Sequence, residues 1–319
     1  MNILITGVCG FIGFSLADEL LKSKNNIYGV DNINNYYSKK LKKKRLSILK
    51  NKKNFKFIFS DINNYKKIIK ETENIKIDII FHFAAQAGVR YAAKNPKSYY
   101  HSNVDGFKKI INFAHYKKPK KFIFASSSSV YGDAKKYPVK EEDNLDPKNL
   151  YAKTKKFNEE YSKKIFKNTD IKVIALRLFT IYGEWGRPDM LILKFLKLAK
   201  QQKPFELNYK GNLYRDFTYI KSAIKIIKIL SKLDFKKNYQ IFNICSSKPI
   251  KVMDIIVMLK KLTKYKNIKN ISMNKHEVYK TYGANKKIIT KTKVKKIFIP
   301  IGVGVKRTFN WYKKYEDLI

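Results

Sequence analysis

Tyr151 and Lys155 stand four residues apart at the start of a stretch with helical spacing, so they would share one helix face. A lysine ammonium beside a phenol favours the phenolate, which lowers a phenol pKa that starts near ~10. A phenolate that also receives a serine hydrogen bond can take the proton of an alcohol while a hydride leaves the same carbon. The chain offers such serines upstream, where the run from Ser126 to Ser129 ends a strand-like segment.

The Tyr-x-x-x-Lys pattern is by itself weak, because this chain is rich in both residue types. It occurs six times, starting at Tyr36, Tyr116, Tyr131, Tyr151, Tyr265 and Tyr282. The pair at Tyr151 is distinguished by its context, which is the serine-ended strand before it and a nucleotide-binding signature at the N-terminus.

That signature is a short apolar strand at 2–6 followed by a glycine-rich turn and a helical pattern. Without side chains, Gly7, Gly10 and Gly13 would let backbone N–H groups and a helix N-terminus meet a pyrophosphate. A second strand ends at Asp31, whose carboxylate can accept from both ribose hydroxyls and repels a 2′-phosphate, so NAD is favoured over NADP. An ordinary turn residue is the alternative for Asp31. The expected cofactor contacts here are Gly7, Gly10, Phe11, Ile12, Gly13, Asp31 and Asn32.

Further strand-like runs at 55–60, 77–83, 121–125 and 172–178 alternate with helical or polar stretches. This alternation predicts an α/β protein with a doubly wound parallel sheet of the Rossmann type. Asp61 and Ile62, after the third strand, are placed to meet an adenine edge. The small residues Ala84 and Ala85, with Gln86, follow the fourth strand and would let a flat cofactor lie against the backbone. Both segments could equally be ordinary loops.

The character of the chain changes after residue 178, where glycine, proline and tryptophan gather at 182–190. We therefore expect an NAD-binding Rossmann domain at 1–178 and a smaller substrate lobe at 179–319, with some segments returning to the sheet. Such a lobe would close over the carboxyl ends of the strands, where open α/β sheets bind ligands. Two helices have apolar faces that could pack on the sheet or form the seam of a homodimer: Phe107, Ile110, Ile111 and Ala114, and Phe157, Tyr161 and Ile165.

The formal net charge of +44 invites a nucleic-acid-binding interpretation. The basic residues are 63 lysines and 6 arginines spread over the whole length, which indicates solvated faces rather than one binding surface. Such a field would still attract an anionic small substrate. The two cysteines, Cys9 and Cys245, show no disulfide pattern, so we expect the protein to reside in the reducing cytoplasm. The cysteines and the four histidines also lack the spacing of metal ligands, so we expect no metal. No apolar run is long enough for a bilayer and the first strand leaves no room for a signal peptide.

Several segments together resemble the extended short-chain dehydrogenase/reductase family, and within it the UDP-glucuronate 4-epimerases. They are TGVCGFIG (6–13), DNINNYY (31–37), AAQAGVRY (84–91), SNVDG (102–106), SSSSVYG (126–132), YAKTK (151–155), LFTIYG (178–183), WGRPDM (185–190) and RDFTYI (215–220). The resemblance runs to about residue 220 and weakens after it.

The resemblance implies an NAD-dependent epimerase of a UDP-sugar. Tyr151 would take the proton of the sugar 4-OH, aided by Lys155 and by Ser127, with Ser128 beside it. Hydride would pass from C4 to a permanently bound NAD⁺ and return to the other face after the 4-keto sugar turns. Asn103 resembles an asparagine that the family keeps near its site, and we expect it to support the cofactor.

Arginines are rare in this chain, and three of the six lie in the segments just named. Their planar fork suits a carboxylate or a phosphate in a way that lysine cannot copy. We assign Arg215 to the UDP diphosphate and Arg187, with Thr180, to the C5 carboxylate of a uronate. Arg90 is assigned to the substrate as well, with a structural role as its alternative. A surface or interdomain ion pair is the alternative for each arginine.

The related dehydratases and decarboxylases have an acid just before the Val-Tyr-Gly segment, where this chain has serine, which speaks against both reactions. Two other functions remain open. One is 4-epimerisation of a neutral UDP-hexose or UDP-N-acetylhexosamine. The other is non-catalytic binding of a nucleotide sugar or of nucleic acid.

Overall fold

A computed structural model describes residues 1–273, 277–294 and 296–319, and for Arg90 the backbone alone. Within those residues seven parallel strands form one sheet in the order β10-β6-β5-β4-β1-β2-β3. The strands are β1 (Asn2–Thr6), β2 (Asn26–Asp31), β3 (Phe55–Phe59), β4 (Ile79–His82), β5 (Lys121–Ser127), β6 (Lys172–Leu178) and β10 (Tyr239–Ile244). The predicted doubly wound α/β fold is confirmed.

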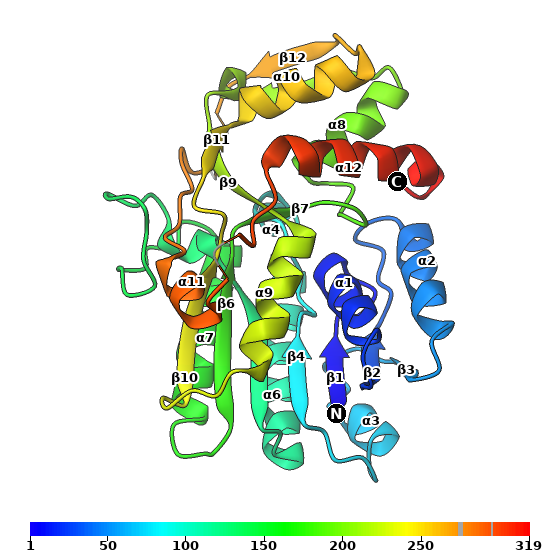
Figure 1. The fold of residues 1–319 in the computed structure, drawn as a ribbon, viewed down its shortest axis with the longest axis vertical. Helices are drawn as coiled ribbons and strands as arrows, with labels where there is room; N and C mark the ends of the chain where they lie inside the picture. Colours follow the sequence, from blue (N-terminus) through cyan, green and yellow to red (C-terminus); the bar gives the residue numbers. More distant parts are fainter. Residues whose placement is uncertain (274–276, 295) are drawn as a thin grey trace.

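Helices cover both faces of this sheet (Figure 1). Ile3 and Ile5 of β1 belong to one buried cluster and Leu4 belongs to another, as expected when both faces of a strand are buried. The first cluster includes residues of α1 (Phe11–Leu20), α2 (Lys39–Lys50), α9 (Ile220–Lys232) and α11 (Lys286–Thr292). The second includes residues of α3 (Tyr65–Glu71) and α6 (Gly106–Lys117), with α7 (Leu150–Ile165) packed against it.

The turn between β1 and α1 requires glycine. Gly7 has a φ of +71°, and a Cβ at this position would lie 2.6 Å from the backbone nitrogen of Ala84. A Cβ on Gly13 would lie 2.2 Å from the carbonyl oxygen of Gly7. The turn therefore packs backbone to backbone, which brings the loop after β1 directly against the loop after β4.

The chain from β4 to α6 is made of short helical pieces, α4 (Val89–Lys94), α5 (Pro96–Tyr99) and the π-helix η1 (Tyr100–Asp105). Beyond β5 a 3₁₀ turn, η2 (Ser128–Tyr131), continues the run of serines. The sequence predicted that β5 ends at residue 125, whereas it continues through Ser126 and Ser127 as they pair with β6. The predicted strand at 77–83 is shorter in the structure, which has β4 at Ile79–His82.

A second layer of structure stands over the carboxyl ends of the strands (Figure 1). It contains a sheet of β7 (Thr180–Tyr182), β9 (Tyr214–Tyr219) and β11 (Pro249–Lys251), and a two-stranded pair of β8 (Phe205–Asn208) and β12 (Ile268–Ile271). Its helices are α8 (Leu191–Lys200), α10 (Val252–Thr263) and α12 (Ile301–Tyr315), with 3₁₀ turns η3 (Tyr209–Gly211) and η4 (Glu316–Leu318). Between these segments the chain returns to the main sheet through α9 and β10.

The apolar faces of α6 and α7 differ in burial. Phe107, Ile110, Ile111 and Ala114 of α6 are fully buried, so this face packs on the sheet rather than forming a seam. On α7, Tyr161 and Ile165 pack against the same core, while the half-buried Phe157 stacks on Tyr161 with ring centroids 5.4 Å apart.

Candidate active site

One large cleft lies at the carboxyl ends of the parallel strands, between the sheet and the second layer. Both parts of the chain contribute to its wall, which agrees with the rule for open α/β sheets. Nineteen of the predicted site residues line it: Gly7, Gly10, Phe11, Ile12, Gly13, Asp31, Asn32, Asp61, Ile62, Ala84, Ala85, Gln86, Ser127, Ser128, Tyr151, Lys155, Thr180, Arg187 and Arg215. Asn103 does not line it, and the side chain of Arg90 lies outside the described part of the structure.

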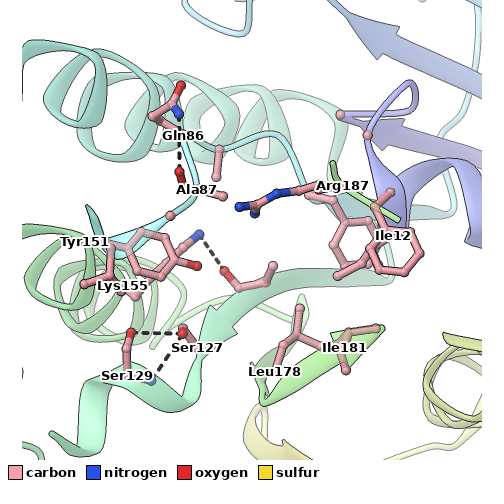
Figure 2. A pocket seen from close by; sticks show the side chains of 18 of the residues that line it. Ile12, Gln86, Ala87, Ser127, Ser129, Tyr151, Lys155, Leu178, Ile181 and Arg187 are labelled. Carbon is pink, nitrogen blue, oxygen red and sulfur yellow. Dashed lines mark hydrogen bonds between the residues drawn. The ribbon is translucent and has the colours of Figure 1, made fainter. Parts of the chain in front are cut away.

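Tyr151 lies in the first turn of α7, which Asn149 caps by accepting a hydrogen bond from the backbone N–H of Ala152 at 2.9 Å. One turn later, the Nζ of Lys155 lies 5.9 Å from the centre of the Tyr151 ring and donates to the carbonyl of Ala125 at 2.8 Å. Figure 2 shows this pair beside Ser127, with the guanidinium of Arg187 reaching into the cleft from another side. The predicted pair therefore shares one helix face directed at the cleft.

Ser127 ends β5 and presents its hydroxyl to the same place. Its Oγ accepts from the Oγ of Ser129 at 2.9 Å and from the backbone N–H of Ser129 at 3.2 Å. These two donors orient Ser127 without using its own O–H group. The Ser127 side chain also acts on the pKa of Tyr151, which it lowers against the effect of burial.

The expectation that Tyr151 has a lowered pKa is wrong for the protein alone. Burial raises the pKa of Tyr151 above its ordinary value, and the hydrogen bond from Ser127 and the charge of Arg187 oppose this only in part. Burial also lowers the pKa of Lys155 to about 8, against the carboxylate of Glu159, which raises it. The ammonium charge follows from the sequence, whereas the free-energy cost of burying both groups depends on the folded structure.

Asn103 lies on the π-helix η1 and is 1% exposed. Its amide donates to the carbonyl of Gln86 at 3.0 Å and to the Thr154 hydroxyl at 3.1 Å, and its Oδ1 accepts from the backbone N–H of Gln86 at 2.8 Å. Asn103 thus ties the loop after β4 to α7. Because Asn103 does not line the cleft, its expected support of the cofactor through Gln86 stays a prediction.

The other side of the cleft has the groups that a dinucleotide requires. The turn of Gly7, Gly10 and Gly13 leads into the N-terminus of α1, where free backbone N–H groups suit a pyrophosphate. Asp31 lies at the end of β2, and its carboxylate accepts from the backbone N–H groups of Cys9 at 2.9 Å and Ile33 at 2.8 Å. Burial raises the pKa of Asp31 while these two bonds lower it. A glycine cradle and an oriented carboxylate fit NAD.

Two of the three arginines assigned to the substrate, Arg187 and Arg215, line the cleft and also form ion pairs. Arg187 makes a bidentate pair with Asp189, at 3.0 Å from Nε to Oδ1 and 2.6 Å from Nη2 to Oδ2. Arg215 donates from Nη2 to Glu277 at 2.8 Å. Arg187 and Arg215 therefore line the cleft, as a substrate-binding role requires, and also form the ion pairs that were the alternative to this role.

Tyr36, Lys42 and Asp189 were not among the site residues predicted from the sequence. Tyr36 and Lys42 line the cleft, and Tyr36 donates to Asp189 at 3.1 Å. Tyr36 follows Asp31 within a motif that had been noted, so proximity to that acid was the available signal. Asp189 lies in the noted segment 185–190, two residues from Arg187, but its second partner Tyr36 is 153 positions away in the sequence.

Residues 1–273, 277–294 and 296–319 contain neither a candidate metal site nor a candidate membrane span. No group of three or more His, Cys, Asp or Glu side chains there could hold a metal ion. No helix there is both long enough and apolar enough to cross a bilayer. Cys9 and Cys245 are buried and unpaired with each other.

Comparison with known proteins gives consistent relatives. An uncharacterised protein of Methanocaldococcus jannaschii is 42% identical over 99% of this chain and 97% of its own length. UDP-glucuronate 4-epimerase 1 of Arabidopsis thaliana is 37% identical over 85% of this chain and 66% of that protein. The crystal structure of UDP-glucuronic acid 4-epimerase from Bacillus cereus, in complex with UDP-glucuronic acid and NAD, superposes with a TM-score of 0.90 at 30% identity, covering 99% of this chain and all of that one.

The model of the NAD dependent epimerase/dehydratase family matches residues 3–245. This range includes the glycine turn, the serine run, the Tyr151–Lys155 pair and both cleft arginines, and it confirms the resemblance drawn from the motifs. The chain belongs to the NAD dependent epimerase/dehydratase family.

Proposed function

We propose that this protein is an NAD-dependent 4-epimerase that interconverts UDP-glucuronate and UDP-galacturonate. The observation that carries the proposal is the arrangement of one cleft, in which Ser127, Tyr151 and Lys155 face a space that Arg187 also enters. Ser127, Tyr151 and Lys155 can together remove and return a hydroxyl proton, and Arg187 can hold a carboxylate. The family match and the similarity to UDP-glucuronate 4-epimerases support both halves of this assignment.

The proton steps belong to the chain itself. Tyr151 accepts the proton of the sugar 4-OH as its phenolate and later returns it, while Ser127 holds the same oxygen region by hydrogen bonding. Lys155, anchored on the carbonyl of Ala125, keeps a positive charge beside the phenolate. Bound NAD⁺ would supply the acceptor for the C4 hydride and a positive charge that favours the Tyr151 phenolate.

The substrate contacts are proposed on the same grounds. Arg187 and Thr180 would hold the C5 carboxylate, Arg215 the diphosphate, and Arg90 a further part of the UDP-sugar. In this division of labour residues 1–178 bind NAD, held by the glycine turn and by Asp31, Asp61, Ile62 and the 84–86 segment. Residues 179–319 supply most of the sugar site.

The test is turnover of UDP-glucuronate and of UDP-glucose, assayed separately with purified protein and no added NAD, and read by NMR of the products. We expect UDP-galacturonate from the first, because the cofactor stays bound through the cycle. Turnover of the neutral sugar alone would instead favour the alternative, a 4-epimerase of a neutral UDP-hexose or UDP-N-acetylhexosamine.

The Tyr151→Phe variant tests the mechanism. It keeps the ring and its packing but removes the proton acceptor, so turnover should fall by at least about 10²-fold while NAD stays bound. Bound NAD is measured by absorbance after denaturation. An active Tyr151→Phe variant would remove Tyr151 from the mechanism, and a variant without NAD would show that the substitution disturbed the site.

We also propose that the protein is a cytoplasmic homodimer. The half-buried Phe157 on α7, with Lys108 of α6 5.6 Å from its ring centre, offers a mixed surface on neighbouring helices that a second copy could cover. Light scattering after size-exclusion chromatography would give the mass, and a mass near 37.5 kDa, that of one chain, would contradict the dimer.

A further inference from the structure

The guanidinium of Arg187 is hydrogen-bonded to the protein along one edge, and the side chain lines the cleft. Its Nε and Nη2 both donate to Asp189, whereas Nη1 makes no hydrogen bond to any residue that the structure describes. Arg187 lines the cleft and Asp189 does not, and the Asp189 side chain is 38% exposed against 19% for Arg187. Asp189 therefore holds the arginine from outside the cleft.

Tyr36 fixes Asp189 in turn. Its hydroxyl donates to the Oδ2 atom of Asp189 at 3.1 Å, and its ring centre lies 5.7 Å from the Arg187 Cζ. The Tyr36 ring packs on Tyr91 with centroids 4.9 Å apart. A Cβ on Gly88, whose φ is +96°, would lie 2.5 Å from the Tyr36 hydroxyl. Three segments, those after β2, after β4 and after β7, thus meet around one arginine.

We infer that Asp189 and Tyr36 are positioning residues that aim the free end of Arg187 at the sugar carboxylate and thereby set the preference for a uronate over a neutral sugar. The inference rests on the proposed function. A long arginine side chain loses considerable rotamer freedom when it is held in one orientation. A bidentate carboxylate fixes the plane of the guanidinium, so this cost is met before the substrate arrives.

The opposite role, in which Asp189 competes with the substrate carboxylate, fits the geometry less well. A competitor would occupy the end of the guanidinium that faces the cleft. Asp189 instead occupies the Nε edge and is absent from the cleft wall. The two roles also predict opposite changes in affinity when Asp189 loses its charge.

The experiment compares binding of two sugars that differ at C6 alone, UDP-glucuronate and UDP-glucose, by calorimetry on NAD-loaded protein. In Asp189→Asn the Kd for UDP-glucuronate should rise about tenfold, the loss expected from one charge-assisted hydrogen bond, with less than about a twofold change for UDP-glucose. Tyr36→Phe should move the same ratio in the same direction by a smaller factor. Asp170→Asn, which removes an exposed acid outside the cleft, is the charge-matched control and should change neither Kd.

The Asp189→Asn substitution made in the Arg187→Lys variant measures the energetic coupling between Arg187 and Asp189 in binding UDP-glucuronate. With the fork already gone, adding Asp189→Asn should change the Kd for UDP-glucuronate much less than it does in the wild type. Retained NAD and an unchanged unfolding midpoint show that each variant is folded. Tighter binding of UDP-glucuronate in Asp189→Asn, an equal loss for both sugars, or no change would each overturn the inference. Wild-type protein that does not turn over UDP-glucuronate would instead overturn the proposed function.

Discussion

Lys155, which we propose as a catalytic residue, destabilises the folded protein because its charge is buried. Its ammonium is buried, with the carbonyl of Ala125 as its hydrogen-bond acceptor. Burial lowers its pKa to about 8 from an ordinary value of 10.5, although Glu159 opposes the change. A lysine whose pKa is lowered by folding destabilises the native state wherever the unfolded chain would keep the proton.

Lys155→Met removes this cost, and the sign of the effect follows from linkage. Between about pH 8 and 10.5 the unfolded chain binds more protons at this position, so the contribution of Lys155 to stability rises with pH across this window. The variant should be inactive, yet on the order of 2–3 kcal/mol more stable than wild type near pH 7, with the gap closing towards pH 10. Guanidinium unfolding of both proteins at each pH measures it. A pH-independent difference would show that Lys155 keeps its ordinary pKa.

At the scale of elements, one buried ion pair links β6 to β5 and α7, two elements that carry proposed catalytic residues. Arg177 of β6 donates to both oxygens of Glu159 on α7, at 2.9 and 2.7 Å, and the side chains are 2% and 5% exposed. Ser126, at the end of β5, donates to the same carboxylate at 2.5 Å. Ser127 and Lys155 lie next to these contacts, so the pair fixes β5 and α7 relative to each other.

Glu159→Gln should therefore destabilise the protein by about 3–5 kcal/mol, because it leaves a buried guanidinium without its counter-charge. The double variant Glu159→Leu/Arg177→Met, which removes both charges, should recover much of this loss. Urea unfolding of the wild type, the single variant and the double variant measures both effects. A single variant that loses less than about 1 kcal/mol would mean that the pair is hydrated.

The elements themselves could be predicted from sequence where local pattern determines them. The glycine turn, Asp31 and the Tyr151 helix follow from spacing, because each depends on neighbours within a few residues. The end of β5 could not be placed, since Ser126 and Ser127 belong to the strand through pairing with Arg177 and Leu178. Polar residues at the end of a strand have a local preference for loop structure, but hydrogen-bonded pairing with a neighbouring strand outweighs this preference.

At the scale of the whole molecule, sequence reasoning fails where distant segments meet. Arg187 could be selected by residue type. The orientation of its guanidinium, however, depends on Tyr36, which lies far away in the sequence, between β2 and α2. Burial is a second long-range quantity. The pKa of Tyr151 was predicted in the wrong direction because the burial of its side chain depends on the folded structure and not on its sequence neighbours.

The charge of the whole molecule leads to a further prediction. The sequence has 69 basic and 25 acidic side chains, so pairing every acid would still leave 44 positive charges uncompensated. Their mutual repulsion destabilises the compact state, and salt screens it. The screening length falls from about 30 Å at 0.01 M salt, the scale of a small domain, to about 10 Å at 0.1 M.

Raising sodium chloride from 0.01 to 0.1 M should therefore raise the unfolding temperature by about 1–2 °C, which corresponds to roughly 1 kcal/mol for a chain of 319 residues. The midpoint is read by circular dichroism at pH 7, where the lysines outside the core are charged. Glycine at the same concentration is the control, because a zwitterion does not screen and should leave the midpoint unchanged. Were chloride to lower the midpoint, attraction among local ion pairs such as Lys228 with Glu19, rather than the net charge, would dominate the electrostatic free energy of folding.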